Sequence, residues 1–257
     1  MQIIEKLNNK NYRIDLATRQ ITFLDSRWYI TDSGNYVPSV TTLLEAYPKG
    51  AQYYEWLKKN GEDSDTIRDE AGERGSRVHK LTERYDAGEE VNLFNEHGDI
   101  SVRLTEWNMF EKYVEFRKQT GWEIECIEKN IVSEELGYAG TLDRIFSYSD
   151  KRILVDIKTS GAIYPTHLLQ LAAYHRLFDS VAPINFIDEV AILWLNAKTR
   201  TEGKKGAIQG KGWQLIRYTA EELTQAYKVF TATKFLWEQE NGDSKPRQTV
   251  YNLSHKQ

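Results

Sequence analysis

The sequence predicts an α/β protein in which a β-rich core follows a helical N-terminal part. Three observations support this fold class. Segments rich in β-branched and aromatic residues are concentrated between residues 122 and 158. Apolar residues at helical spacing lie before and after them. The 257 residues contain no internal repeat and no low-complexity linker, so we expect one domain rather than several.

The N-terminal part is expected to start with short strands and to continue as helices. The first 35 or so residues alternate apolar and polar positions, which is typical of strands. Residues 38–44 indicate a turn leading into a helix that ends near Pro48. Further helices are expected over about 51–60, 66–87 and 101–119, so that about 36–120 form a helical part.

The core is expected over about 121–240. Strands are predicted at about 122–133, 140–148 and 153–158. Pro165 is suited to the first turn of a helix that runs to about Phe178. Strands at 190–196 and 212–218 follow, and Thr219 with Glu222 is typical of a capping box that opens a last helix. Residues 241–257 are polar and form a loosely held tail.

A predicted hairpin brings charged side chains together. If Ser149 and Asp150 form its two-residue loop, Asp143 lies opposite Asp156, and Thr141 lies opposite Lys158. Directly opposed residues share a sheet face, and Lys158 shares the face of Asp156 because it lies two positions along. Two carboxylates and an ammonium therefore converge. Adjacent carboxylates repel unless a cation lies between them.

This convergence favours a site for a hard divalent cation. Carboxylate oxygens select Mg²⁺ or Mn²⁺ rather than zinc. A neighbouring lysine can help deprotonate an attacking water or hold a phosphate oxygen, as phosphodiester hydrolysis requires. The alternative is a surface ion pair between Asp143 and Lys158. Because Asp156 follows the apolar run 153–155, we expect it to be buried and to need a compensating partner, which favours the metal site.

Four short motifs occur in a recognisable order: residues 75–83 (GSRVHKLTE), 140–143 (GTLD), 156–159 (DIKT) and 170–174 (QLAAY). Together they resemble the PD-(D/E)XK nuclease superfamily, and within it the RecB-type exonuclease branch, over about residues 37–178. Residues 38–42 (PSVTT) also resemble the opening of phage-encoded members and of the mitochondrial genome maintenance exonuclease. The resemblance implies a restriction-endonuclease-like core of order αβββαβ, with a mixed central sheet flanked by helices.

The resemblance also implies roles for individual residues. His79, Asp143, Asp156 and the main-chain carbonyl of Ile157 would be the metal ligands, and Lys158 the catalytic lysine. Glu83 would support the metal site or contact bound water, while Gln170 and Tyr174 would position the lysine region and the nucleic-acid backbone. Leu142 stands where many members have proline before the aspartate. Cys126 is the one cysteine, so the four-cysteine iron–sulfur cluster of some relatives is excluded.

Nucleic-acid contacts are expected in two regions. Six basic residues and one acidic residue lie between 196 and 218, interleaved with glycines, which indicates a basic loop along phosphates. The alternative is a solvated surface loop. A net charge of −4 argues against binding through bulk charge but permits a local basic groove. The predicted contacts are Ser39, Thr41, Thr42, Arg74, Arg77, Lys198, Arg200, Lys204, Lys205 and Lys211.

The predicted activity is that of a Mg²⁺- or Mn²⁺-dependent deoxyribonuclease. We expect an exonuclease that takes single-stranded or frayed DNA ends through an arch formed by the helical part. By resemblance, its setting would be phage DNA replication, recombination or repair, with a single-strand-binding protein or a recombinase as a further partner. The same motifs serve a structure-specific endonuclease or flap nuclease, which stays open. A DNA-binding module with an inactive site is the non-enzyme alternative.

Other functions are excluded by what the sequence lacks. No apolar run approaches the roughly 20 residues of a membrane span. The glycines at 206–212 do not have the spacing of a phosphate-binding loop, so ATP use is not expected. Residues 1–10 lack a basic segment followed by an apolar one, and one cysteine fits a reducing compartment. We therefore expect a cytoplasmic protein, in the bacterial host if the chain is phage-encoded.

Overall fold

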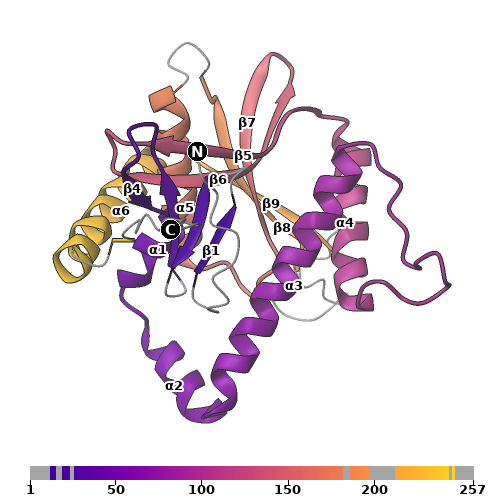
Figure 1. The fold of residues 1–257 in the computed structure, drawn as a ribbon. Coiled ribbons are helices and arrows are strands. Elements are labelled where there is room, and N and C mark those ends of the chain that lie inside the picture. Colours follow the sequence, from indigo (N-terminus) through magenta and orange to yellow (C-terminus); the bar gives the residue numbers. More distant parts are fainter. Residues whose placement is uncertain are drawn as a thin grey trace, which may run out of the picture.

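The computed structural model contains two β-sheets and flanking helices (Figure 1). It describes residues 12–15, 19–23, 26–181, 186–196, 212–242 and 245–246. The predicted α/β class is confirmed, because a mixed five-stranded sheet lies between helices. No helix in the described part of the chain combines the length and the apolar character needed to cross a membrane.

The first sheet is an antiparallel meander of four strands. Its strands are β1 (Tyr12–Asp15), β2 (Gln20–Phe23), β3 (Ser26–Ile30) and β4 (Tyr36–Pro38), paired in chain order. The short helix α1 (Val40–Leu43) and the 3₁₀ turn η1 (Leu44–Ala46) follow. Ser39 begins α1 as its N-cap, and its side chain accepts a hydrogen bond from the Thr42 main-chain N–H.

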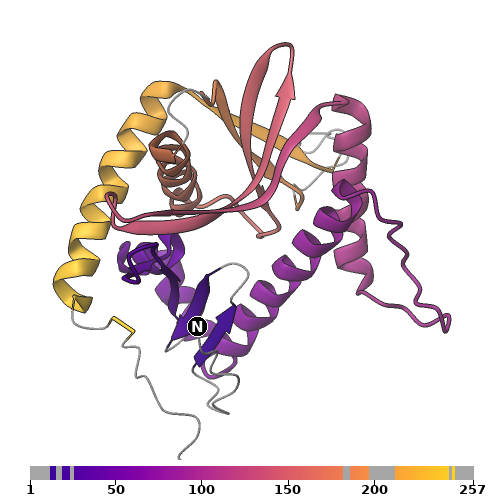
Figure 2. The same ribbon diagram turned by 45° about the horizontal axis from the view of Figure 1, so that its top comes forward.

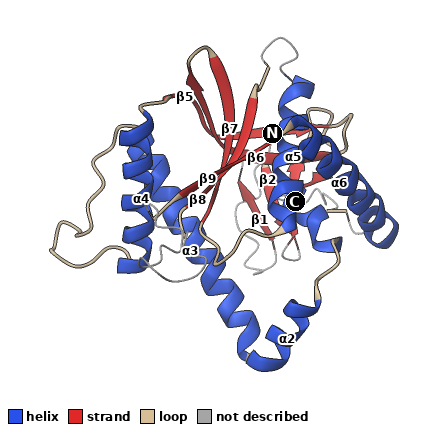
Figure 3. Ribbon diagram, turned by 180° about the vertical axis from the view of Figure 1, so that it is seen from behind, coloured by secondary structure: helices blue, strands red, loops and turns tan. Residues whose placement is uncertain are grey.

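Three helices then lead to the second sheet: α2 (Ala51–Asn60), α3 (Asp63–Asp86) and α4 (Leu104–Thr120). The predicted helices are confirmed, with ends that shift by up to three residues. Helix α2 and the N-terminal half of α3 extend away from both sheets, as Figures 1 and 3 show. No residue of α2 is buried. Only the C-terminal half of α3 lies along the core.

The second sheet has the strand order β5-β6-β7-β8-β9. These strands are β5 (Glu123–Ser133), β6 (Tyr138–Tyr148), β7 (Lys151–Lys158), β8 (Glu189–Trp194) and β9 (Gln214–Tyr218). All neighbours are antiparallel except β7 and β8, which are parallel and joined by the crossover helix α5 (Pro165–Val181). This gives the predicted order αβββαβ, extended by β9 and by α6 (Ala220–Asn241), which Thr219 and Glu222 cap as predicted.

Side chains of the second sheet alternate between two apolar cores. On β7, Leu154 packs with α5 and α6, whereas Ile153 and Val155 pack with residues of α3 and α4. Figure 2 shows α5 and α6 on one side of this sheet and α3 and α4 on the other. Because both faces are covered, a polar side chain in the middle of β6 or β7 is buried unless the packing leaves an opening.

The hairpin between β6 and β7 has the predicted register. Its last described pair is Arg144–Val155, and its first is Tyr148–Lys151, so Ser149 and Asp150 form the two-residue loop. Both loop residues have positive φ angles, 47° and 62°, as a type I′ turn requires. The turn thereby fixes which residues of the two strands lie opposite each other.

Candidate functional site

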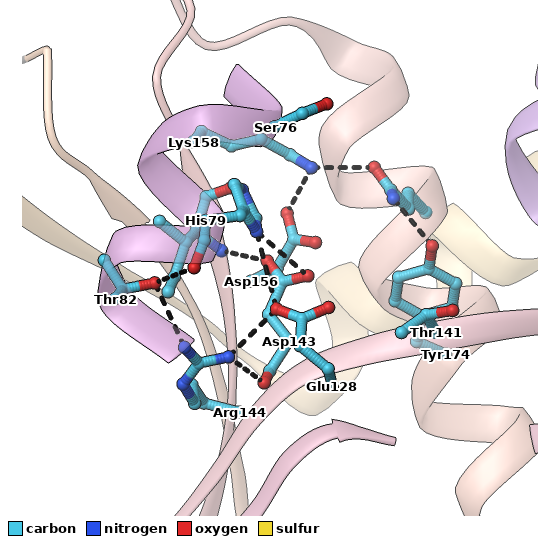
Figure 4. Close-up of polar contacts among 12 residues, drawn as sticks. Ser76, His79, Thr82, Glu128, Thr141, Asp143, Arg144, Asp156, Lys158 and Tyr174 are labelled. Carbon is cyan, nitrogen blue, oxygen red and sulfur yellow. Dashed lines mark hydrogen bonds and ion pairs between the residues drawn. The ribbon is translucent and has the colours of Figure 1, made fainter. Parts of the chain in front are cut away.

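Asp143 and Asp156 lie together where the β6–β7 ladder ends. Asp143 directly precedes Arg144, the last paired residue of β6, and Asp156 directly follows Val155, its partner on β7. Beyond Arg144–Val155 the strands no longer pair with each other. The main-chain N–H of Ile157 instead donates a 2.6 Å hydrogen bond to Asp143 Oδ2. The Asp143 side chain thus completes the pairing there, and its carboxylate lies close enough to that of Asp156 to repel it (Figure 4).

His79 reaches this point from α3. Its Nε2 lies 3.1 Å from the main-chain oxygen of Ile157, as a hydrogen bond. Its Nδ1 lies 3.7 Å from Asp143 Oδ1 and 3.6 Å from Glu128 Oε1. Because His79 sits on the half of α3 that packs against the sheet, the ring approaches the strand ends from the side opposite α5. The structure therefore brings His79, Asp143 and Ile157 together.

Glu128 is a member of the site that the sequence motifs did not indicate. It lies on β5 between the pairs Ile127–Arg144 and Lys129–Leu142, and therefore opposite Asp143. Its φ of 44° falls in the left-handed region, where a residue with a side chain is uncommon. His79, Glu128 and Asp143 each offer one ligand atom, and these atoms lie within 4.8 Å of one another.

Asp156 lies beside His79, Glu128 and Asp143, and Lys158 contacts Asp156. The Lys158 Nζ is 2.7 Å from Asp156 Oδ2, which makes an ion pair. Asp156 is 1% exposed, and apart from the Lys158 ammonium its carboxylate has no hydrogen-bond donor among the described residues. A buried carboxylate with so few donors carries a large desolvation cost. This cost falls when a cation binds, so Asp156 fits a cation site.

A chain of hydrogen bonds continues from Lys158 into α5. Lys158 Nζ donates to Gln170 Oε1 at 2.9 Å, and Gln170 Nε2 donates to the Tyr174 hydroxyl at 2.8 Å. The ring of Tyr174 crosses Gly140 so closely that a Cβ there would lie 2.4 Å from its Cε1. The glycine of the 140–143 motif thus leaves room for the tyrosine of the 170–174 motif.

The close packing of charges shifts several pKa values. Burial, with repulsion from Asp143, raises the pKa of Asp156 to about 6, although Lys158 opposes the shift. Burial lowers the pKa of His79, but attraction by Asp143 and Glu128 outweighs burial and raises it above 6.5 overall. Burial and the charge of Lys158 lower the pKa of His167 to about 3, so its ring is neutral near pH 7.

Glu83 does not join the site as expected. It is exposed on α3, one turn beyond His79, and it makes none of the described side-chain contacts with His79 or Asp143. Glu128 occupies the neighbourhood of His79 instead. The residues of α3 that meet the sheet at this point are His79, Thr82 and Asp86, and the exposed Glu83 lies to the side of them.

Two of the predicted DNA contacts have a structural use instead. Ser39 and Thr42 are each 2% exposed, and their hydroxyls bond to each other and to the main chain of α1 and Arg27. Ser39 caps α1, and Thr42 ties α1 to Arg27. Thr41 is exposed. It lines a hollow of 210 Å³ together with Leu44, Glu45, Lys49, Thr166 and Gln170.

The predicted basic contacts divide into two groups. Arg77 bonds to the buried Glu106 at 2.9 Å and to Glu73 at 3.0 Å, so it fastens α3 to α4. Arg74 is half-buried on the same helix. The other predicted contacts, Lys198, Arg200, Lys204, Lys205 and Lys211, lie outside the described residues. A larger hollow of 570 Å³ lies between α5, α6 and the start of β8, and none of the candidate site residues lines it.

Sequence reasoning missed Glu128 because it belongs to no motif. The signal that could have found it is the first hairpin. Counting back from the turn between β5 and β6 places Glu128 opposite Asp143, by the same logic that paired the second hairpin.

No protein-family model matches the sequence, and a search of curated proteins found no match. The chain is similar in structure to a protein from Eubacterium rectale named "Putative exonuclease", at 13% identity and a TM-score of 0.46, over 80% of this chain and 81% of that one. It is also similar to Can2 from Sulfobacillus thermosulfidooxidans, solved with cyclic tetra-adenylate, at 13% identity and a TM-score of 0.22, over 68% of this chain and 57% of that one. A function for this chain therefore has to come from the geometry of its own site.

Proposed function

We propose that this protein is a metal-dependent deoxyribonuclease. The observation that carries the proposal is the convergence of Asp143, Asp156 and His79 with Lys158 at the open end of the β6–β7 ladder. Buried carboxylates that repel each other need a cation to stabilise the folded chain. An ammonium beside such a cation matches the needs of phosphodiester hydrolysis.

The donor atoms of the site suit a hard divalent ion. His79, Glu128, Asp143 and Asp156 would hold it, with the main-chain oxygen of Ile157 beside them. Oxygen donors outnumber nitrogen donors, which favours Mg²⁺ or Mn²⁺ over zinc. When bound, the ion would make water more acidic and offset negative charge on the phosphate. The buried Asp156 carboxylate, whose one partner among the described residues is the Lys158 ammonium, is the plainest sign of this fit.

Lys158 has its position set from two sides. Asp156 attracts its ammonium, and Gln170 accepts a hydrogen bond from it, so the amine is held at the end of β7 with one further donor to offer. That donor can bind a phosphate oxygen and stabilise the charge that grows on it as the bond breaks. Tyr174 fixes Gln170 in turn. We propose that this series of hydrogen bonds orients Lys158 for catalysis.

DNA is the proposed substrate, reached along the face that α1 and α5 border. In the 210 Å³ hollow, Thr41, Lys49 and Thr166 lie beside Gln170. Gln170 in turn accepts a hydrogen bond from Lys158. The hydroxyl and ammonium groups of the hollow are suited to phosphate oxygens. On α2, the stacked rings of Tyr53 and Trp56 could contact unpaired bases. DNA ends would pass between the sheet and the segment formed by α2 and the N-terminal half of α3, which would make the enzyme an exonuclease. Its setting would be phage replication, recombination or repair.

The test is incubation of the full chain with end-labelled single-stranded and double-stranded DNA, in Mg²⁺, Mn²⁺ or EDTA. We expect cleavage with either metal and none with EDTA. An Asp143→Asn chain, purified in parallel, controls for contaminating nuclease. Circular single-stranded DNA separates the exonuclease from the endonuclease alternative, because only an endonuclease cuts it. Absence of metal-dependent cleavage on all substrates contradicts the proposal.

A further inference from the structure

Arg144 is a fully buried arginine directly after the candidate ligand Asp143. Its side chain is 0% exposed. The side chain lies on the α3 side of β6, where it contacts Thr82 and Asp86. Burying a guanidinium is costly unless all of its donors are paired, and its positive charge also opposes the binding of a cation nearby. Its presence at this position therefore calls for a specific role.

The donors of Arg144 reach every member of the His79, Glu128 and Asp143 trio. Nη1 donates to Glu128 Oε1 at 3.0 Å and to the main-chain oxygen of Asp143 at 2.6 Å. Nη2 donates to the Thr82 hydroxyl at 3.0 Å, and that hydroxyl donates to the main-chain oxygen of His79 at 2.8 Å. One guanidinium is thus tied, directly or through a single hydroxyl, to all three residues (Figure 4).

The charge of Arg144 is offset from the other side. Its Nε donates to Asp86 Oδ2 at 2.6 Å, and the Asp86 carboxylate is fully buried. Asp86 also accepts a hydrogen bond from the Tyr113 hydroxyl and lies 3.2 Å from Arg117 Nε. Asp86 therefore offsets part of the charge of Arg144, and Glu128 is not its only anionic partner. Only Oε1 of Glu128 is engaged by Arg144 among the described hydrogen bonds.

The three elements that Arg144 joins are those that carry the trio: α3, β5 and β6. A planar guanidinium offers five donors in fixed directions, whereas an ammonium offers three from one point. Lysine at this position would keep the charge but could not span acceptors on three elements. We propose that Arg144 is a positioning residue for divalent-ion binding, which holds His79, Glu128 and Asp143 at the spacing that the ion needs. The proposal rests on the proposed function, since it concerns the same site.

The test compares Arg144→Lys with the parent chain in the absence of DNA. Isothermal titration with Mn²⁺ gives the dissociation constant, and a thermal melt in EDTA gives stability. Arg117→Lys is the matched control, because Arg117 contacts Asp86 and the Trp122 carbonyl but none of the trio. We expect both variants to melt at lower temperature, and only Arg144→Lys to bind Mn²⁺ more weakly, by about 10- to 100-fold. Equal affinity in the parent and in folded Arg144→Lys overturns the proposal, as does an equal loss in both variants.

Thr82→Val keeps the inference testable if Arg144→Lys does not fold. This substitution keeps the shape of the side chain and removes only the link between Arg144 and the His79 carbonyl. We expect a smaller loss of Mn²⁺ affinity than in Arg144→Lys, and an unchanged affinity contradicts the positioning role. A parent chain that binds no Mn²⁺ contradicts the proposed function itself. A parent that binds Mn²⁺ as tightly as its variants contradicts only the role of Arg144.

Discussion

Asp143 and Ile157 are joined by a hydrogen bond in which a side chain replaces a strand partner. The Ile157 N–H donates to Asp143 Oδ2 at 2.6 Å, just beyond the last pair of the β6–β7 ladder. The same residue of β7 meets His79 through its main-chain carbonyl. The end of the ladder therefore creates the site, since the strands diverge there and side chains from α3 and β6 take up the main-chain groups of β7.

Lys158→Ala should remove DNA cleavage and leave DNA binding largely unchanged. The ammonium is the one donor that both Asp156 and Gln170 hold at the end of β7, so its loss removes charge stabilisation at the phosphate. We expect a fall in cleavage rate of at least about 100-fold. Lys80→Ala is the control, because Lys80 is exposed on α3 next to His79. Normal turnover by Lys158→Ala would show that this role is wrong.

Glu128→Gln should weaken Mn²⁺ binding, whereas Glu83→Gln should not. The Glu128 carboxylate lies within 4.8 Å of the ligand atoms of His79 and Asp143, while Glu83 is exposed. We expect a loss of affinity of at least about tenfold for Glu128→Gln, measured by titration calorimetry. The opposite result, with Glu83 as the sensitive position, would favour the arrangement expected from the sequence motif over the one in the structure.

Asp156→Asn should stabilise the metal-free chain at neutral pH. Folding raises the pKa of Asp156 from 3.8 to about 6, chiefly through burial. Between these pH values the folded chain keeps a proton that the unfolded chain has released, so the free energy of unfolding falls as pH rises and the loss is complete above about pH 6. The difference corresponds to roughly 3 kcal/mol.

Thermal melts in EDTA at pH 4 and pH 7.5 check this prediction. We expect the Asp156→Asn chain to melt at higher temperature than the parent at pH 7.5, and the difference to shrink at pH 4. Addition of Mn²⁺ should reverse the order at pH 7.5, because the parent gains more from the ion. Identical pH profiles for the two chains in EDTA would mean that burial does not raise the pKa of Asp156.

Gly140→Ala should destabilise the fold and, through Tyr174 and Gln170, disturb the position of Lys158. The added methyl would lie 2.4 Å from the ring of Tyr174, which is buried, so the ring must move and pull on Gln170. Overpacking of this kind costs about 1–3 kcal/mol. Gly72→Ala is the control, since no atom lies within 4 Å of its added Cβ and helix α3 gains about 0.5–1 kcal/mol. Urea denaturation of both variants measures the difference, and equal midpoints would contradict it.

The sequence alone determined the local structure well, because that structure depends on near neighbours. Turn chemistry at Ser149 and Asp150 fixed the register of the second hairpin, which brings Asp143 and Asp156 to the same end of the ladder. The capping pair Thr219 and Glu222 and the proline at the start of α5 set helix ends within a few residues. Four short motifs then pointed to the side chains that the structure brings together.

Only the tertiary structure decided which charges complete the site. Glu128, Asp86 and Arg144 lie on three elements, and their meeting depends on how α3 packs against the sheet. The same packing turns Glu83 toward solvent, and the folding of the first sheet onto α1 buries Ser39 and Thr42. Sequence periodicity shows which side of a helix or strand is apolar. It does not give the angle or depth at which two elements meet, and those determine which polar groups come within a few ångströms of each other.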